Sequence, residues 1–252
     1  MKKSLINILD FETDEINEVF QKAQALKKLS PPNNYAPLKG KALGMIFKKS
    51  STRTRISFEV GMYQLGGKAL FLDHKDLQWE RGETLSDSAR VLSIYLDGIV
   101  IRTFSHQEIE DLVKTANVPV INGLSDLLHP CQILTDIFTL QEHVDNLKKT
   151  KIVYLGDGNN IANSWVNGTA RMGLDLRIVC PKNYLPDLDI LKIAQVETVK
   201  TGGKIELCHD PEDGVSGADV IYTDVWVSMG QEGESKKKKE ILKPFQLNSD
   251  LV

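Results

Sequence analysis

The segment KALGMIFKKSSTRTRISFEVGMYQLGGKALFL, residues 41–72, decides the fold of this chain. Its two ends, 41–47 and 68–72, are short apolar runs with the length of buried strands. The stretch between them, 53–65, carries a helical pattern and begins in a Ser/Thr-rich turn. A strand, a helix and a second strand in this order form a right-handed crossover, so the segment predicts parallel strands in one sheet.

The same alternation runs through the rest of the chain. Further strands are predicted at 98–102, 118–122, 151–156, 174–180, 204–208 and 219–225, and further helices at 85–96, 106–116 and 131–146. This pattern indicates an α/β fold of two doubly wound parallel-sheet domains. We expect the first domain to cover 1–132, a connecting helix 133–148, and the second domain 149–252.

Composition is that of an ordinary globular protein. The chain has 252 residues, of which 41% are hydrophobic and 26% charged, and its formal net charge is −3. So weak an acidic balance gives no reason to expect a nucleic-acid partner. No apolar run approaches the ~20 residues that cross a bilayer, so no membrane partner is expected. Three cysteines without metal-ligand spacing favour a reducing cytoplasm and argue against disulfides or a zinc cluster.

Two features near the end of the chain lead to separate expectations. The lysine run 236–239 is expected to be a solvated loop or helix start, because four lysines alone bind a polyanion weakly. The second half has about four strands and ends at NSDLV with no terminal helix in the pattern. We therefore expect the second domain to be incomplete at its C-terminus.

The strongest local motif is SSTRTR, residues 50–55, which lies between a strand and a helix. Backbone N–H groups at a helix N-terminus lack partners and favour an anion. Ser51, Thr52 and Thr54 add hydroxyl donors there, and guanidinium groups grip phosphate oxygens in pairs. The alternative is a simple Ser/Thr cap with two surface arginines. The motif is not a P-loop, because GxxxxGK[ST] is absent.

Two further residues are candidate donors at the same rim. His129, in HPCQ (129–132), precedes a helix and could donate to a developing oxyanion, although a structural histidine is the commoner case. Arg102 ends the strand 98–102 and is either a third anion ligand or an exposed strand end. Cys131 is interpreted as a small buried residue, since no base is paired with it.

The second half offers two weaker motifs. GDGNN (156–160) follows a strand, but residue 161 is Ile rather than a third glycine, which disfavours a nicotinamide site. In DVWVSMG (224–230) the Asp could pair with an ammonium, while Ser228 and the backbone could hold a carboxylate. The two adjacent amides of GDGNN suit a small polar ligand better, whereas DVWVSMG taken alone favours an ordinary loop.

Taken in order, these motifs resemble the aspartate/ornithine carbamoyltransferase family, and its ornithine branch in particular. The resemblance rests on SSTRTR with the following SFE, on DSARVLSIYLDGIVIR, NGLSDLLHPCQILTD, GDGNN and DVWVSMG, and covers essentially the whole chain. It implies a carbamoyl phosphate domain followed by an ornithine domain. The implied carbamoyl phosphate residues are Ser51, Thr52, Arg53, Thr54, Gln78, Arg102, His129, Pro130, Cys131 and Gln132. The implied ornithine residues are Asn160, Asp224, Ser228 and Met229.

The resemblance also implies a reaction. The δ-amine of L-ornithine would attack carbamoyl phosphate and give L-citrulline and phosphate, with Arg102, His129 and Thr54 as the catalytic groups. Neither a metal nor an organic cofactor is expected, and the family implies a homotrimer. Three alternatives stay open: a sister enzyme that uses N-acetylornithine or putrescine, a catalytically impaired phosphate-binding relative, and, least favoured, a nicotinamide dehydrogenase.

One departure from the family pattern carries its own expectation. The family has a further His-Cys-Leu-Pro motif, whose cysteine meets ornithine, and a last helix that returns to the first domain. Neither occurs in this sequence, and Cys180 and Cys208 do not stand in such a motif. The phosphate site is therefore expected to be complete and the ornithine site unfinished. On this basis the chain should bind carbamoyl phosphate better than it turns it over.

Overall fold

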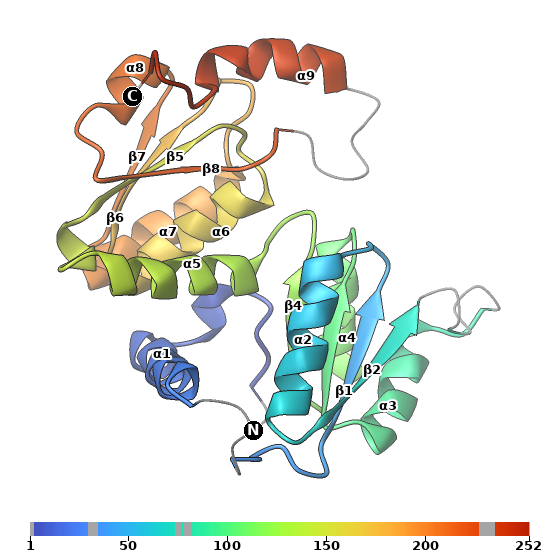
Figure 1. Ribbon diagram of the computed structural model, residues 1–252. Coiled ribbons are helices and arrows are strands. Elements are labelled where there is room, and N and C mark those ends of the chain that lie inside the picture. Colours follow the sequence, from blue (N-terminus) through green and yellow to red (C-terminus); the bar gives the residue numbers. More distant parts are fainter. Residues whose placement is uncertain (1–2, 30–34, 74–76, 78–81, 227–234, 252) are drawn as a thin grey trace. The chain divides into compact units, whose positions relative to one another are not determined.

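The structure, a computed structural model, describes residues 3–29, 35–73, 77, 82–226 and 235–251. The chain divides into two compact units, Met1–Cys131 and Gln132–Val252 (Figure 1). Each unit is built on its own four-stranded sheet, in which every described strand pairing is parallel. The predicted α/β fold with two parallel sheets is therefore confirmed.

The first unit has strand order β2-β1-β3-β4. Its elements are η1 (Ile8–Asp10), α1 (Thr13–Lys27), β1 (Ala42–Phe47), α2 (Thr52–Gln64), β2 (Lys68–Asp73), α3 (Leu85–Tyr95), β3 (Gly98–Arg102), α4 (His106–Thr115), β4 (Val120–Leu124) and the start of α5 (Pro130–His143).

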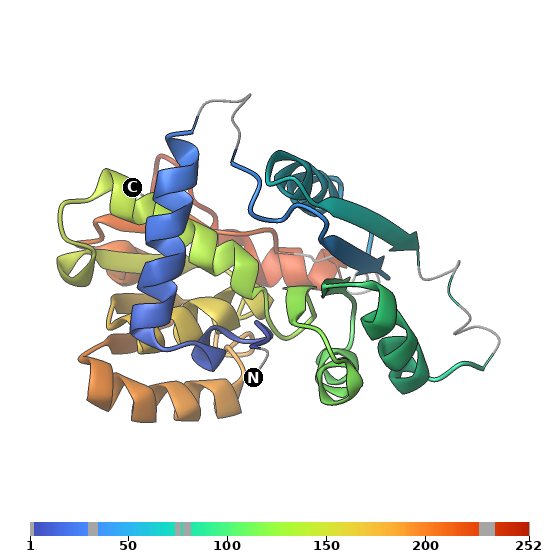
Figure 2. The same ribbon diagram turned by 90° about the horizontal axis from the view of Figure 1, so that it is seen from below.

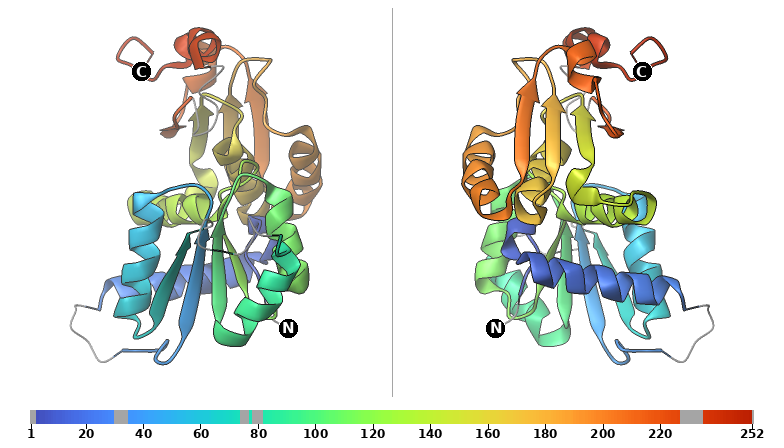
Figure 3. Two further views of the ribbon diagram at one scale, coloured as in Figure 1. Left: turned by 90° about the vertical axis from the view of Figure 1, so that its right-hand side faces the viewer. Right: turned by 90° about the vertical axis from the view of Figure 1, so that its left-hand side faces the viewer.

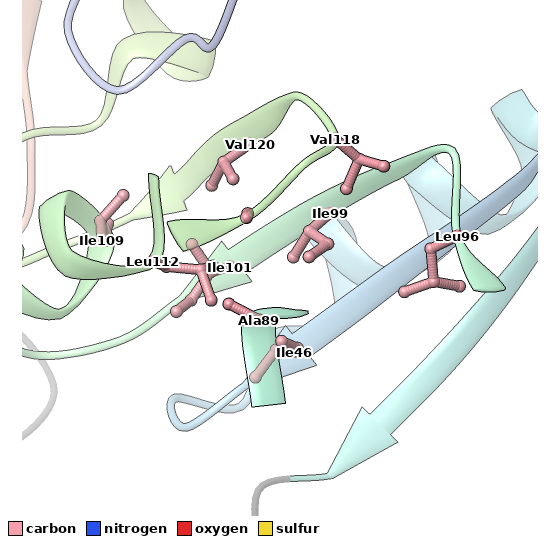
Figure 4. Packing of buried hydrophobic residues seen from close by; sticks show 10 residues of the cluster. Ile46, Ala89, Leu96, Ile99, Ile101, Ile109, Leu112, Val118 and Val120 are labelled. Atoms are coloured by element: carbon pink, nitrogen blue, oxygen red, sulfur yellow. The ribbon is translucent and has the colours of Figure 1, made fainter. Parts of the chain in front are cut away.

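Side chains alternate along β1 and bury both faces of this sheet. Leu43, Met45 and Phe47 pack with Met62 of α2 on one face. Ile46 belongs to the opposite cluster, which includes Ala89 of α3 together with residues of β3, α4 and β4 (Figure 4). Helix α2 accordingly lies on one side of the sheet, and α3 and α4 lie on the other (Figure 3).

The second unit has strand order β7-β6-β5-β8. After the rest of α5 its elements are η4 (Leu147–Lys149), β5 (Lys151–Leu155), α6 (Asn160–Met172), β6 (Asp175–Val179), α7 (Leu188–Thr201), β7 (Lys204–Cys208), α8 (Pro211–Val215), β8 (Val220–Thr223), α9 (Ser235–Leu242) and η6 (Lys243–Phe245).

The second sheet is also covered on both faces. Val153 and Leu155 of β5 pack with Phe245 and with partly buried residues of and after α8. Tyr154 points to the other face, where its ring stacks on Tyr222. Helices α6 and α7 pack side by side (Figure 2). Strands buried on both faces read as continuous apolar runs, which is why the sequence pattern locates them.

The strand orders place one switch point in each unit. In the first unit β2 is added on one side of β1 and β3 on the other, so the switch point lies between β1 and β3. In the second unit β6 and β7 are added on one side of β5 and β8 on the other, so the switch point lies between β5 and β8. Open parallel sheets bind ligands beyond the carboxyl ends of the strands at such a point. Residues 48–54 and 102–104 lie there in the first unit, and residues 156–160 and 224 in the second.

Two expectations need correction. Strand β4 is Val120–Leu124 rather than 118–122, because Pro119 has no N–H for the ladder and contributes only its carbonyl, which accepts from the Ile99 N–H at 2.9 Å. The lysine run forms the start of α9, as one of the two expected alternatives had it, but it is not wholly solvated, because Lys238 is only 8% exposed.

Gly158 is expected to tolerate no side chain. A Cβ added there would lie 2.2 Å from the carbonyl carbon of Leu185, which is backbone and cannot rotate away. We predict that Gly158→Ala destabilises the protein by about 1–3 kcal/mol in chemical unfolding. The matched control is Gly61→Ala, which has open space within α2 and should be neutral or stabilising. Equal unfolding midpoints for the two variants would contradict the prediction.

Candidate active site

The segment 51–54 begins α2 at the carboxyl end of β1. Ser51 is the N-cap: its Oγ accepts from the Thr54 N–H at 3.3 Å and donates to Thr54 Oγ1 at 3.0 Å. The Ser/Thr cap considered from the sequence is thus present. A cap of this kind orients the first N–H groups of the helix outward, so it is compatible with anion binding at the same place.

The two arginines of this segment differ in their surroundings. Arg55 donates to Glu59 at 2.9 Å, and its guanidinium lies 3.8 Å from the ring centroid of Phe71. Arg53 is exposed at the helix start, and its charge acts on Arg102. Arg55 is therefore held on the side of α2, whereas Arg53 remains available at its N-terminus.

Arg102 is a buried cation at the end of β3. Only 6% of the residue is exposed, so the alternative of an exposed strand end is wrong. Its guanidinium makes one long hydrogen bond, to the Gly123 carbonyl at 3.5 Å, and its Nε has no partner. Burial, and then the charge of Arg53, lower the pKa of Arg102. Among the described residues, no carboxylate is recorded in an ion pair with it.

His129 lies directly before α5 and is electrostatically coupled to Arg102. Burial, and then the positive charge of Arg102, lower the pKa of His129 to about 4. The imidazole is therefore neutral at physiological pH and can donate one N–H without carrying charge. Pro130, the next residue, is buried and opens the helix.

Cys131 follows in the first turn of α5. Its Sγ donates to the Asn122 carbonyl at 3.4 Å, and burial raises its thiol pKa to about 12. A thiol that stays protonated is a poor nucleophile. The side chain is therefore suited to packing beside the site rather than to covalent chemistry.

The structure adds a lysine that the motif analysis missed. Lys49, directly before the SSTRTR segment, is 6% exposed, forms an ion pair with Asp126 and lies 4.5 Å from the ring centroid of Phe104. Its neighbour Lys48 pairs with Glu108 at 2.6 Å. The sequence signal that could have identified Lys49 is the pair of lysines directly after a buried strand. Both have acidic partners, whereas no acidic partner is recorded for Arg53 or Arg102 in the part of the chain that the structure describes.

In the second unit, the GDGNN turn connects β5 to α6. Asn159 is the N-cap of α6 and accepts from the N–H groups of Ile161 and Ala162. Its Nδ2 also donates to Asp224 Oδ2 at 3.2 Å, so the turn after β5 is tied to the residue after β8. Asn160, the residue singled out from the sequence, is buried in the first turn of the same helix.

A buried ion pair also holds the turn 156–160, through Asp157. Lys238 of α9 donates to Asp157 Oδ2 at 2.6 Å, and the two side chains are 10% and 7% exposed. Burial raises the pKa of Asp157, and the charge of Asp224 raises it further, while Lys238 opposes both effects. Lys238 was missed because a run of lysines is normally solvated.

Gln132, in the first turn of α5, donates from Nε2 to Asp136 at 3.0 and 3.2 Å. Asp136 also shares a hydrogen bond with Tyr222 of β8. Asp136, Asp157 and Asp224 therefore surround the carboxyl ends of β5 and β8. Gln78, Ser228 and Met229 lie outside the described residues.

Two other kinds of site are absent from the described part of the chain. No group of three or more His, Cys, Asp or Glu side chains there is placed to hold a metal ion. None of the helices described is both long enough and apolar enough to span a bilayer.

The ionisation of His129 is directly measurable. The pKa of His129 should be near 4 by NMR titration, and Arg102→Met should raise it while leaving it below 6.5, because burial is the larger cause. Arg53→Met is the control and should leave the His129 titration in place. The folded protein binds fewer protons than the unfolded chain between about pH 4 and 6.5, so this group lowers stability as pH falls through that range. A His129 pKa unchanged in Arg102→Met would contradict the coupling.

The Lys238–Asp157 pair should contribute strongly to stability. Lys238→Met leaves a buried carboxylate without its cation, and we predict a loss of about 3–5 kcal/mol in the free energy of unfolding. Lys239→Met, on the exposed side of α9, should change it little. Adding Asp157→Asn to Lys238→Met should recover part of the loss. Similar unfolding midpoints for the two lysine variants would refute the assignment.

Comparison with known proteins identifies the family. Residues 3–142 match "Aspartate/ornithine carbamoyltransferase, carbamoyl-P binding domain", and residues 148–252 match "Aspartate/ornithine carbamoyltransferase, Asp/Orn binding domain". An ornithine carbamoyltransferase of Syntrophus aciditrophicus is 55% identical over 100% of this chain and 83% of that protein.

Solved structures agree with this result. An ornithine carbamoyltransferase from Pyrococcus furiosus has a TM-score of 0.93 at 48% identity and covers 99% of this chain and 80% of its own. An anabolic ornithine carbamoyltransferase from Campylobacter jejuni has a TM-score of 0.92 at 38% identity, covering 100% of this chain and 82% of its own. The chain belongs to the aspartate/ornithine carbamoyltransferase family.

Proposed function

We propose that this chain transfers the carbamoyl group of carbamoyl phosphate to the δ-amine of L-ornithine, giving L-citrulline and phosphate. Its relatives at 48–55% identity are named ornithine carbamoyltransferases. The observation in the structure that carries the proposal is Arg102, a buried guanidinium with one long hydrogen bond and no recorded acidic partner among the described residues. An anionic substrate would supply the missing acceptors.

Carbamoyl phosphate would bind at the switch point of the first unit. The proposed contacts for its phosphate are the N-terminal N–H groups of α2, the hydroxyls of Ser51 and Thr52, and the guanidinium of Arg53. A helix N-terminus favours an anion through its unpaired N–H groups and its dipole. The charge of Arg53 lowers the pKa of Arg102, and a bound dianion would relieve that repulsion.

Catalysis would be mainly electrostatic. When the amine nitrogen attacks the carbonyl carbon, a C–N bond forms and the carbonyl oxygen becomes an oxyanion. Arg102, the neutral imidazole of His129 and the hydroxyl of Thr54 would donate to that oxygen. The C–O bond to phosphate then breaks, the electron pair leaves with phosphate, and the nitrogen loses a proton. The attacking amine must be deprotonated first, since an ammonium has no lone pair.

Ornithine would be held by the second unit. Asp224 would pair with an ammonium group, and its own position is set by the hydrogen bond from Asn159. Asn160, Ser228 and Met229 are the other proposed contacts, on the basis of the family resemblance. Contacts of this kind fix the orientation of the acceptor before the reaction, which lowers the entropic part of the barrier.

The proposal also covers the oligomeric state, the cellular compartment and the metabolic role. We propose a homotrimer in the cytoplasm, and two of the similar proteins are named anabolic, which supports a role in arginine biosynthesis.

The test is a product assay with three acceptors at equal concentration: L-ornithine, N-acetylornithine and putrescine. Carbamoyl transfer to ornithine should dominate, and Arg102→Met should lower kcat by roughly 10²–10³-fold, the usual effect of removing one oxyanion donor. The control is Arg90→Met, an exposed residue whose partner is Asp87 on the same helix. Preferential use of another acceptor, or full activity in Arg102→Met, would count against the proposal.

A further inference from the structure

His106 lies at the same end of the first sheet as Arg102. It is the first residue of α4, directly after its N-cap Ser105, and it is partly buried. Its Nδ1 lies 2.9 Å from the Oγ of Ser125, a fully buried residue that follows β4. Because β3 and β4 are neighbouring parallel strands, this contact ties the start of α4 to the segment that connects β4 to α5.

Ser125 closes a turn, residues 125–128, that ends directly before His129. Its N–H donates to the Leu128 carbonyl at 2.9 Å, and its Oγ accepts from the Leu128 N–H at 3.1 Å. Leu128 is itself buried, so this end of the turn is fixed in the core. On the other side of His129, Pro130 restricts the backbone of the residue before it. The turn therefore determines where the His129 ring lies.

The imidazole of His106 orients the Ser125 hydroxyl. Two acceptors are recorded for that hydroxyl, His106 Nδ1 at 2.9 Å and the Leu128 carbonyl at 3.4 Å, and the shorter contact is the better hydrogen bond. Burial lowers the pKa of His106, against the charges of Glu110 and Asp10, which raise it. A neutral imidazole has one acceptor nitrogen, and we assign Nδ1 to that role. The Ser125 lone pairs then stay directed at the Leu128 N–H.

The properties of His129 depend on where its ring lies. Burial is the larger cause of its low pKa, and the charge of Arg102 is the second. A ring that moved towards solvent would lose the first effect, and a ring that moved away from the end of β3 would lose the second. The pKa of His129 therefore reports its placement in the folded protein.

We propose that His106 is a positioning residue, which acts through Ser125 and the turn 125–128 to hold the His129 ring buried and close to Arg102. The placement itself can be tested without turnover. Its catalytic consequence rests on the proposed function, in which His129 donates to an oxyanion that forms only in the transition state. A misplaced donor then lowers kcat, whereas binding of carbamoyl phosphate by the start of α2 is largely kept.

The test is an NMR titration of the imidazole resonances in the full chain. The chain has five histidines, and the His129 signal is identified by its loss in His129→Gln. In His106→Ala, the pKa of His129 should rise from about 4 to about 5 or higher, because the turn loses a buried hydrogen bond and relaxes. Alanine is a strong helix former, so α4 is kept.

A conservative variant and a double variant show the route of the effect. Asparagine carries an oxygen acceptor at about the position of Nδ1, so His106→Asn should keep the His129 pKa near the wild-type value. Ser125→Ala should raise it as His106→Ala does, and the double variant should add little to the larger single effect. Additive effects would overturn the assigned route. If Ser125→Ala does not fold, the two His106 variants carry the test.

His209 provides the matched structural control. Its Nδ1 also makes a hydrogen bond, at 2.8 Å to the Cys180 carbonyl in the second unit. His209→Ala removes that contact and should leave the His129 pKa unchanged, whatever its effect on stability. A merely structural His106 would behave in the same way. A lower unfolding midpoint in His106→Ala together with an unchanged His129 pKa would therefore overturn the inference.

Kinetics then separate the inference from the proposed function. In His106→Ala, kcat should fall roughly tenfold, less than the 10²–10³-fold of losing an oxyanion donor outright, and His106→Asn should restore it. The calorimetric Kd for carbamoyl phosphate should stay within about threefold of wild type. Citrulline formation by the wild type with an unmoved His129 pKa in His106→Ala would overturn the inference and leave the proposed function standing. A raised His129 pKa with unchanged kcat would support the positioning and refute the catalytic role proposed for His129.

Discussion

A guanidinium buried without a recorded acidic partner among the described residues is the constraint around which the first unit is arranged. Burying a charge is costly unless it is paired, yet Arg102 has one long hydrogen bond and a nearby arginine that adds repulsion. The neighbouring lysines have carboxylate partners, whereas none is recorded for Arg53 or Arg102 across the described ranges. The fold carries this unfavourable arrangement at the switch point of its sheet, where a dianionic ligand would remove the penalty.

The second unit gathers carboxyl groups at its switch point, whereas the first gathers cations. Three carboxyl groups, those of Asp136, Asp157 and Asp224, lie at the carboxyl ends of β5 and β8, and the charge of Asp224 raises the pKa values of the other two. Lys238 neutralises Asp157, while Asp136 and Asp224 are held by neutral donors. Asp136 and Asp224 have no recorded cationic partner among the described residues, so an acceptor that carries an ammonium group suits this edge. The two switch points are complementary to the two proposed substrates.

Local pattern predicted the strands and the helix starts because these depend on near neighbours in the chain. A strand buried on both faces reads as a continuous apolar run, and a helix start is marked by cap residues within a few positions of it. The burial of Lys238 could not be predicted from local pattern, because it depends on a residue that is distant in the chain. Its partner Asp157 is 81 residues away, and only the placement of α9 brings the two together. Likewise, Arg102 lies at the end of an apolar strand, where the local pattern does not distinguish a buried end from an exposed one.

The neutral state of His129 limits the chemistry that the proposed reaction can use. With a pKa near 4, held down by burial and by Arg102, the imidazole carries no extra proton to give to the departing phosphate at neutral pH. A neutral N–H and a permanently charged guanidinium can still stabilise an oxyanion without transferring a proton. Phosphate is a stable leaving group that needs no strong acid, so the site loses little by this. The main chemical demand then falls on the acceptor, whose amine must arrive deprotonated.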